Sequence, residues 1–246
     1  MDNLPPNWEI PRKTWVDRAQ AFFEVLLVSG LLSSALAGLV FYLLQGKRGL
    51  DLLANAKAFS IFILLEAGIA LLILTVVLKI HRETISTLGL KWDRWKFHCA
   101  LGLVVVPFLF MINALVAVVF KIYLPQYFVE KNPITELIHT RQQLVLIVIS
   151  ALIAGGIKEE LQRALILTRF RSYLGGAWLG LVLWSGVFGA GHYVQGVQGV
   201  VIATIYGFVF GIIYLMSGSL IAPIIAHGAY DAIALIAYWL FSGRFR

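Results

Sequence analysis

The stretch that decides the fold is residues 99–124, CALGLVVVPFLFMINALVAVVFKIYL, in which Lys121 is the only charged side chain. A helix needs about 20 mostly apolar residues to cross a bilayer, so this stretch is long enough to span a membrane. Six further segments are mainly apolar, namely residues 21–44, 58–80, 144–170, 177–192, 197–216 and 220–241. The sequence therefore predicts about seven transmembrane helices, within a range of roughly six to eight.

The composition of the whole chain agrees with a membrane protein. Of 246 residues, 60% are hydrophobic and 13% are charged, and the mean hydropathy is +0.85. A soluble domain usually carries about 25% charged residues, so a water-soluble globule is excluded. We expect an all-α, polytopic membrane helical bundle forming a single membrane domain over residues 1–246. Within it, residues 1–139 would supply N-terminal helices and an interfacial elbow, and residues 140–241 a functional core.

The basic residues indicate contact with lipid. The chain has 20 Lys and Arg against 13 Asp and Glu, a formal net charge of +7. These basic residues lie in short segments beside apolar runs, so lipid head groups are the expected partner and nucleic acid is not. The segment 79–98 combines basic residues with Trp92 and Trp95, which predicts an elbow on the membrane surface. The single cysteine, Cys99, cannot form an internal disulfide and is expected to be a small buried residue.

The N-terminus predicts a retained membrane helix. The chain is polar through Arg18, and the apolar run that follows over residues 21–44 is too long for a signal peptide. The expected location is therefore an integral, multi-pass membrane protein, in the cell inner membrane if the source is bacterial.

Ionisable residues divide the chain into two chemically different parts. Away from their ends, the first three apolar segments contain few of them, Glu24 and Glu66, which we expect to be buried partners or to lie near water. The last four segments contain many, including Lys158, Glu159, Glu160, Arg163, His192, His227 and Asp231. A charge in the middle of a bilayer costs about 2.5–3.5 kcal/mol on insertion scales, so unpaired charges there mark a pathway or an active site. The functional part is therefore expected in the C-terminal half.

Helical spacing brings one group of charges together. Arg163 lies four residues after Glu159 and three after Glu160, so its guanidinium can reach either carboxylate. Taken alone, this group is explained by a structural salt bridge at a helix end, because Arg169 and Arg171 indicate that the interface is near.

Two histidines from other segments change that interpretation. His227 and Asp231 are four residues apart and would share one helical face, and His192 ends another apolar segment. Together with Glu159 they form the set of side chains needed to take a proton from water and to stabilise a developing oxyanion.

Other chemistries can be weighed on the same residues. Glu159, His192, His227 and Asp231 could also bind Zn²⁺, for which three His or carboxylate ligands and an open position are usual. A proton relay in a transporter also uses such clusters, although the sequence shows no convincing inverted repeat. The sequence lacks the H-E-x-x-H of membrane zinc proteases and the G-x-S-G of rhomboid-type serine proteases, which excludes both.

The order of these motifs resembles the CPBP family of membrane peptidases, named for CAAX-protein and bacteriocin processing and also called type II CAAX prenyl endopeptidase-like or Abi proteins. Its motifs are a double Glu followed by Arg on one helix, F-x-x-x-H on a later helix, and H-x-x-x-N or H-x-x-x-D on the last. Residues 140–241 contain corresponding motifs in this order, as Glu159-Glu160, Phe188…His192 and His227…Asp231. The resemblance implies an all-α membrane bundle with a polar cavity.

The resemblance also implies a role for each residue. Glu159 would be the general base that activates water, assisted by His192. His227 and Asp231 would orient water or stabilise the tetrahedral oxyanion. The family has been described both as metal-dependent and as a metal-independent glutamate peptidase, and the resemblance favours the latter. No cofactor is therefore expected, with Zn²⁺ on the same four residues as the alternative.

One position departs from the family pattern. Glu160 and Arg163 would support the catalytic groups from behind, but the family usually shows E-E-x-x-x-R, and here Ala164 occupies the place of that Arg. Arg163 is thus rotated by about 100° around the helix. Either it still reaches Glu160 across three residues, or the contact has been rearranged.

The function implied by the resemblance is intramembrane hydrolysis of a peptide bond. The substrate would be a membrane-associated peptide, a prenylated CAAX protein or a small peptide, which makes the bilayer and a peptide or lipidated protein the expected partners. The alternatives are a proton-coupled transporter or a non-catalytic bacteriocin-immunity protein that uses the same polar cluster. The sequence predicts no oligomeric state.

Overall fold

The computed structural model describes residues 13–46, 53 and 55–242, and over these ranges the chain forms helices and loops without a strand. The polar N-terminal stretch up to residue 12 lies outside the described residues. Five helical spans are long and apolar enough to cross a membrane, and Ala177–Ala190 is a shorter apolar helix. The protein is an integral membrane protein with an all-α fold, which confirms the fold class predicted from the apolar segments.

The described helices follow the seven predicted segments. In chain order they are α1 (Trp15–Val28), α2 (Leu31–Gln45), α3 (Ala56–Ile80), α4 (Trp95–Tyr123), α5 (Pro133–Glu136), α6 (Arg141–Ala151), α7 (Glu160–Tyr173), α8 (Ala177–Ala190), α9 (Gly196–Ser217) and α10 (Ile221–Phe241). Short 3-10 helices cover Ile85–Leu88, Pro125–Tyr127 and Tyr193–Gln195, and a π-helical segment, Leu152–Glu159, joins α6 to α7.

The first predicted helix, over residues 21–44, is divided in two. Helix α1 ends at Val28 and α2 begins at Leu31, with Gly30 between them at a φ of 95°, a left-handed conformation that glycine adopts without strain. Gln162 of α7 donates a side-chain N–H to the Val28 carbonyl at 2.7 Å in the buried interior. The break is therefore a packed feature in which another helix satisfies a main-chain acceptor.

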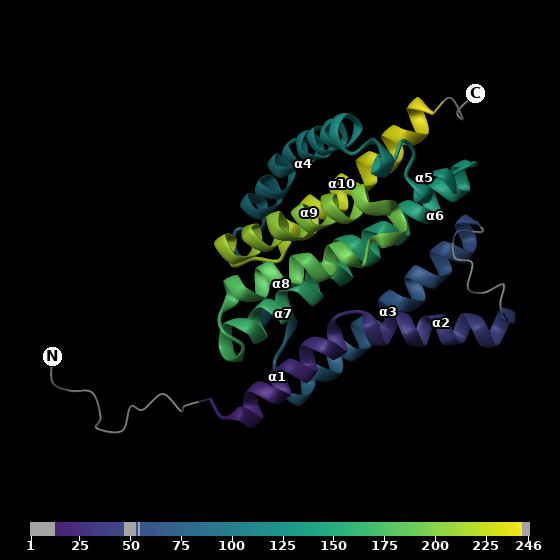
Figure 1. Ribbon diagram of the computed structural model, residues 1–246. Coiled ribbons are helices and arrows are strands. Elements are labelled where there is room, and N and C mark those ends of the chain that lie inside the picture. The colour runs from purple at the N-terminus through teal and green to yellow at the C-terminus, as the bar shows by residue number, and fades with distance from the viewer. Residues whose placement is uncertain (1–12, 47–52, 54, 243–246) are drawn as a thin grey trace, which may run out of the picture.

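Helices α7 and α8 lie between two groups of helices. Figure 1 shows α1, α2 and α3 along one side of them and α4, α9 and α10 along the other. The largest apolar cluster packs Leu165 and Ile166 of α7 against Leu74 of α3 and Trp184 of α8. Many large apolar side chains point outward, with Phe241 88% exposed. Such a surface suits lipid, whereas in water it would drive association.

Helix α4 lies at the periphery and packs closely on α10. A Cβ atom added at Gly102 would stand 2.6 Å from the Ala222 carbonyl oxygen, so the two helices can only approach this closely because position 102 is glycine. Cys99, expected to be buried, is half-buried, because only part of a peripheral helix faces the interior.

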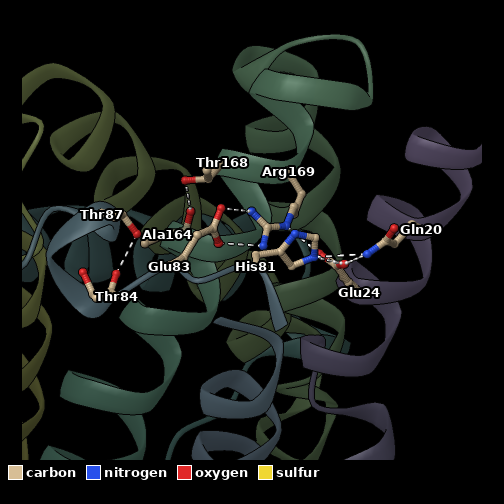
Figure 2. Close-up of polar contacts among 9 residues, drawn as sticks. All are labelled: Gln20, Glu24, His81, Glu83, Thr84, Thr87, Ala164, Thr168 and Arg169. Carbon is tan, nitrogen blue, oxygen red and sulfur yellow. Dashed lines mark hydrogen bonds and ion pairs between the residues drawn. The ribbon is translucent and has the colours of Figure 1, made fainter. Parts of the chain in front are cut away.

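An ion network centred on the buried side chains of Glu24 and Arg169 joins α1, the turn after α3 and α7 (Figure 2). Arg169 donates through Nε to Glu24 Oε2 at 2.6 Å, and through Nη1 and Nη2 to the two Glu83 oxygens at 3.0 and 2.7 Å. Glu24 Oε1 lies 2.6 Å from His81 Nε2 and accepts from Gln20 Nε2 at 3.1 Å. Of the two expectations for Glu24, the structure shows the buried partner.

Candidate active site

The candidate site is built on the π-helical segment Leu152–Glu159, which interrupts the helix predicted over residues 144–170. π-Helical turns are wider than α-helical turns and are often found at functional sites. A Cβ atom added at Gly155 would stand 2.8 Å from Asp231 Oδ2 and 3.2 Å from His227 Nε2. The missing side chain therefore leaves room for the polar groups of α10 beside this segment.

Glu160 and Arg163 lie behind the site in the protein interior. Both side chains are fully buried, and the Arg163 guanidinium forms an ion pair with Glu160 across three residues. Of the two expectations for Arg163, the structure therefore shows the contact with Glu160. Neither residue lines the large cavity described below.

His227 is held in one orientation by Glu160. Its Nδ1 lies 2.7 Å from Glu160 Oε1, and because a carboxylate only accepts, Nδ1 carries the hydrogen. The other nitrogen, Nε2, lies 3.9 Å from Glu159 Oε2 and 3.6 Å from Asp231 Oδ2. These distances are too long for direct hydrogen bonds, so Nε2 is directed between two carboxylates without being bound to either.

Glu159 is less buried than its neighbour Glu160. Its side chain is 19% exposed, and its Oε1 lies 3.5 Å from the ammonium of Lys158. Its second oxygen, Oε2, is the one nearest to His227. One carboxylate oxygen is thus paired with a cation while the other is directed toward the histidine.

His192, predicted as the last residue of the segment 177–192, lies in the turn after α8, which ends at Ala190. Gly191 caps the helix, and the chain leaves it at this point. The i, i+4 relation still matters, because His192 Nδ1 lies 2.8 Å from the Phe188 carbonyl oxygen. This contact holds the ring at the end of α8.

Four of the predicted residues meet at one cavity of about 570 Å³. Glu159, His192, His227 and Asp231 line it, together with apolar side chains such as Phe59 and the segment that connects α4 to α6. Main-chain N–H of Val129 in this segment donates to Gln198 Oε1 at 2.9 Å. The cavity thus combines several groups able to transfer protons with an apolar wall, which is the usual composition of a ligand-binding pocket.

Residues 140–233 match the family model described as type II CAAX prenyl endopeptidase Rce1-like. Over these residues the chain is similar to that family, and we call residues 140–233 the CAAX-protease segment. The match extends from the start of α6 into α10 and contains every residue predicted for the site. The chain has no match among curated proteins and none among solved structures.

Two phenylalanines shape the interior of the CAAX-protease segment. The Phe188 ring lies 4.7 Å from the His192 ring and 6.2 Å from the His227 ring, measured between centroids. Phe210 stacks on His227 at 4.6 Å, and Arg163 lies over Phe188 and Phe210 at 4.9 and 5.5 Å. Phe210 was missed by the sequence analysis, because an aromatic residue in an apolar helix carries no signal of its own.

Two charged residues of the cavity wall were also given no role in the sequence analysis. Lys158 and Glu66 line the cavity beside Glu159, and their charged atoms lie 3.0 Å apart. Both stand out as charges in apolar segments, so a signal was available. The sequence offers no means of pairing them, because they lie on α3 and the π-helical segment. Glu66, like Glu24, is a buried partner.

The four residues proposed as alternative zinc ligands do not fit a metal ion in this arrangement. Over the described residues, no group of three or more His, Cys, Asp or Glu side chains could hold one. The Lys158 ammonium lies 3.5 Å from Glu159, and a second cation on that carboxylate would be repelled.

Proposed function

We propose that this protein is an intramembrane endopeptidase that hydrolyses a peptide bond of a membrane-associated substrate, with Glu159 as the general base. One observation carries the proposal: Glu159, His192, His227 and Asp231, which come from three separate parts of a segment similar to a protease family, line one cavity. A charged cluster with only a structural role would have no need of a cavity.

The first step uses Glu159 and His192. Glu159 Oε2 takes a proton from water, and the water oxygen attacks the carbonyl carbon of the substrate. His192 assists by holding the water, because its Nδ1 is fixed by the Phe188 carbonyl and its ring lines the same cavity. The products of this step are a tetrahedral oxyanion and a protonated Glu159.

The second step uses His227 and returns Glu159 to its starting state. With both ring nitrogens protonated, His227 donates from Nε2 to the oxyanion while Glu160 accepts from Nδ1. The carbon–nitrogen bond then breaks, and the proton on Glu159 passes to the departing amine. Asp231, 3.6 Å from Nε2, favours the charged imidazole that the oxyanion needs.

The cavity supports a substrate that is partly apolar. Phe59 and Ile63 of α3 and Leu235 of α10 form part of its wall, whereas Asn132 and Gln195 add polar groups. Asn132 Nδ2 donates to Gln195 Oε1 at 3.0 Å, which fixes the amides at the end of the cavity near His192. We propose that a peptide with an apolar or lipidated segment, such as a prenylated CAAX sequence, enters laterally from the bilayer.

The test is hydrolysis by purified protein in liposomes without an ion gradient. The probes are a farnesylated CAAX peptide and the same peptide without lipid. Wild type should cleave at least one of them, and Glu159→Gln should abolish cleavage while the protein remains folded. Asp93→Asn, an exposed carboxylate in the elbow, is the matched control. Full activity of Glu159→Gln would refute the mechanism. Gradient-driven uptake without any hydrolysis would favour a transporter.

A further inference from the structure

Lys158 is a buried cation that has no role in the proposed hydrolysis steps. We propose that Lys158 is a positioning residue for Glu159, and that Glu66 of α3 and Ser33 of α2 hold Lys158 in place. The inference rests on the proposed function, because it concerns the orientation of the proposed base. It assigns to α2 and α3 a part in positioning a proposed base that lies within residues 140–233.

A chain of polar contacts runs from α2 to the proposed base. The Ser33 hydroxyl donates to Glu66 Oε1 at 2.6 Å, and Glu66 Oε2 lies 3.0 Å from Lys158 Nζ. Lys158 Nζ lies in turn 3.5 Å from Glu159 Oε1. Lys158 is 7% exposed, Glu66 4% and Ser33 0%, so these contacts are shielded from water. Shielding strengthens each electrostatic contact and makes an unpaired member costly.

Lys158 gives the two carboxylate oxygens of Glu159 different surroundings. Lys158 pairs with Oε1, whereas Oε2 is the oxygen directed toward His227. A carboxylate held at one oxygen has less freedom to rotate, and its second oxygen keeps a fixed direction. Glu159 Oε2 would then be presented to water in the orientation that proton transfer needs.

Sharing Lys158 between two carboxylates also limits how strongly it binds Glu159. Nζ is 0.5 Å closer to Glu66 than to Glu159, from contacts of 3.0 and 3.5 Å. A lysine paired with Glu159 alone would neutralise the base more fully and weaken it as a proton acceptor. Glu66 therefore holds the Lys158 ammonium close enough to orient Glu159, but not so close that it fully neutralises the Glu159 carboxylate.

A purely structural role for Lys158 predicts a different result from substitution. In that case Lys158 and Glu66 form a buried ion pair that joins α3 to the π-helical segment, and Glu159 is a bystander. Removing one partner of such a pair leaves an uncompensated buried charge, whereas removing both charges together is far less disruptive. The double variant Lys158→Met with Glu66→Gln therefore separates stability from positioning, since the amide oxygen introduced by Glu66→Gln can still accept from the Ser33 hydroxyl.

The experiment measures kcat, KM and Tm in liposomes for wild type, Lys158→Met and the double variant, with a peptide that wild type cleaves. Lys57→Met, an exposed lysine in the first turn of α3, is the control. We expect Lys158→Met to lower Tm and the double variant to recover most of that loss. We expect kcat to fall about 10- to 100-fold in both, with KM nearly unchanged, because the base is misplaced.

Two results would overturn the positioning role alone. The first is wild-type kcat in Lys158→Met, and the second is a double variant that recovers kcat together with Tm, which a purely structural role requires. If wild type cleaves neither peptide, the proposed function fails, and the positioning role fails with it.

Discussion

Helix α7 carries a buried arginine near each end, and the two arginines differ in the number of carboxylates that they contact. Arg169 bonds through all three of its nitrogens to two carboxylates, Glu24 and Glu83. Arg163 has one carboxylate, Glu160, and its Nε and Nη2 find no hydrogen-bond acceptor within the described ranges. The Arg169 cluster, in which every guanidinium nitrogen has a partner, joins three parts of the fold. The Arg163 cluster, which has fewer partners, lies beside the cavity.

This difference separates structural from functional charge inside one bundle. A buried cation with a full set of acceptors contributes to the fold and has nothing left to offer a substrate. A cation faced by aromatic rings keeps its charge available to the neighbouring groups, here Glu160 and through it His227. Substitution of Arg169 should therefore mainly change the free energy of unfolding, whereas substitutions around the candidate site should mainly change kcat.

The largest effect is expected on stability, from Arg169→Met. The variant leaves Glu24 and Glu83 without their cation, and breaking a buried pair from one side costs about 3–5 kcal/mol. Chemical unfolding in detergent measures the loss. Lys91→Met, an exposed lysine of the elbow, is the control. The folded fraction of Arg169→Met should keep the wild-type kcat. A lower kcat at unchanged stability would show instead that Arg169 serves the site and not the fold.

His192→Ala should show the opposite pattern, with a smaller free-energy effect. Loss of the imidazole proposed to hold the water should lower kcat at least ~10²-fold, or about 2.7 kcal/mol of transition-state stabilisation. Tm should stay close to that of wild type, because His192 lies in a turn and its side chain bonds only to the adjacent Phe188 carbonyl among the described residues. Peptide cleavage and thermal unfolding on the same preparation decide the matter.

A double-mutant cycle on Glu160 and Arg163 comes next in size. Glu160→Gln, Arg163→Met and the double variant should show a coupling of about 0.5–3 kcal/mol in stability, as for residues in contact. The measurement is unfolding free energy in detergent for all four proteins. Additive effects would mean that the two buried charges do not interact, contrary to their ion pair.

The smallest effect is expected for Asp231→Asn. Glu160 already fixes His227 through Nδ1, and Asp231 is 3.6 Å from Nε2, so loss of its charge should leave much of the activity. The measurements are the rate, the metal content by elemental analysis and the response of wild type to a chelator. A stoichiometric metal in wild type that is lost from the variant would defeat the glutamate-peptidase mechanism.

The sequence predicted much of this arrangement, because helix periodicity is a local property. The apolar segments predicted the helices, and the spacing of Arg163 allowed contact with Glu159 or Glu160, of which the structure contains the contact with Glu160. The catalytic roles of the site residues stay predictions. Their shared cavity could be anticipated only from the order of the motifs, since spacing along one helix says nothing about distances between helices.

The features that could not be predicted from the sequence depend on contacts between residues far apart in the chain. The π-helical turns at Leu152–Glu159 form where Gly155 packs against His227 and Asp231, so no local pattern announces them. Likewise, Lys158 and Glu66 were visible as charges, but their pairing depends on how α3 packs beside the segment. The hydrogen bond that orients His227 comes from Glu160 and not from Asp231, its neighbour on the same helix.

The break between α1 and α2 has a consequence for biogenesis. The ribosome makes Val28 long before Gln162, yet the Gln162 side chain is what satisfies the Val28 carbonyl in the buried interior. Val28 lies near the middle of the span Trp15–Leu44, where an unsatisfied main-chain group costs several kcal/mol in hydrocarbon. The first span therefore reaches its final state only after α7 has been inserted, so assembly of the N-terminal helices must wait for the segment that carries the candidate site.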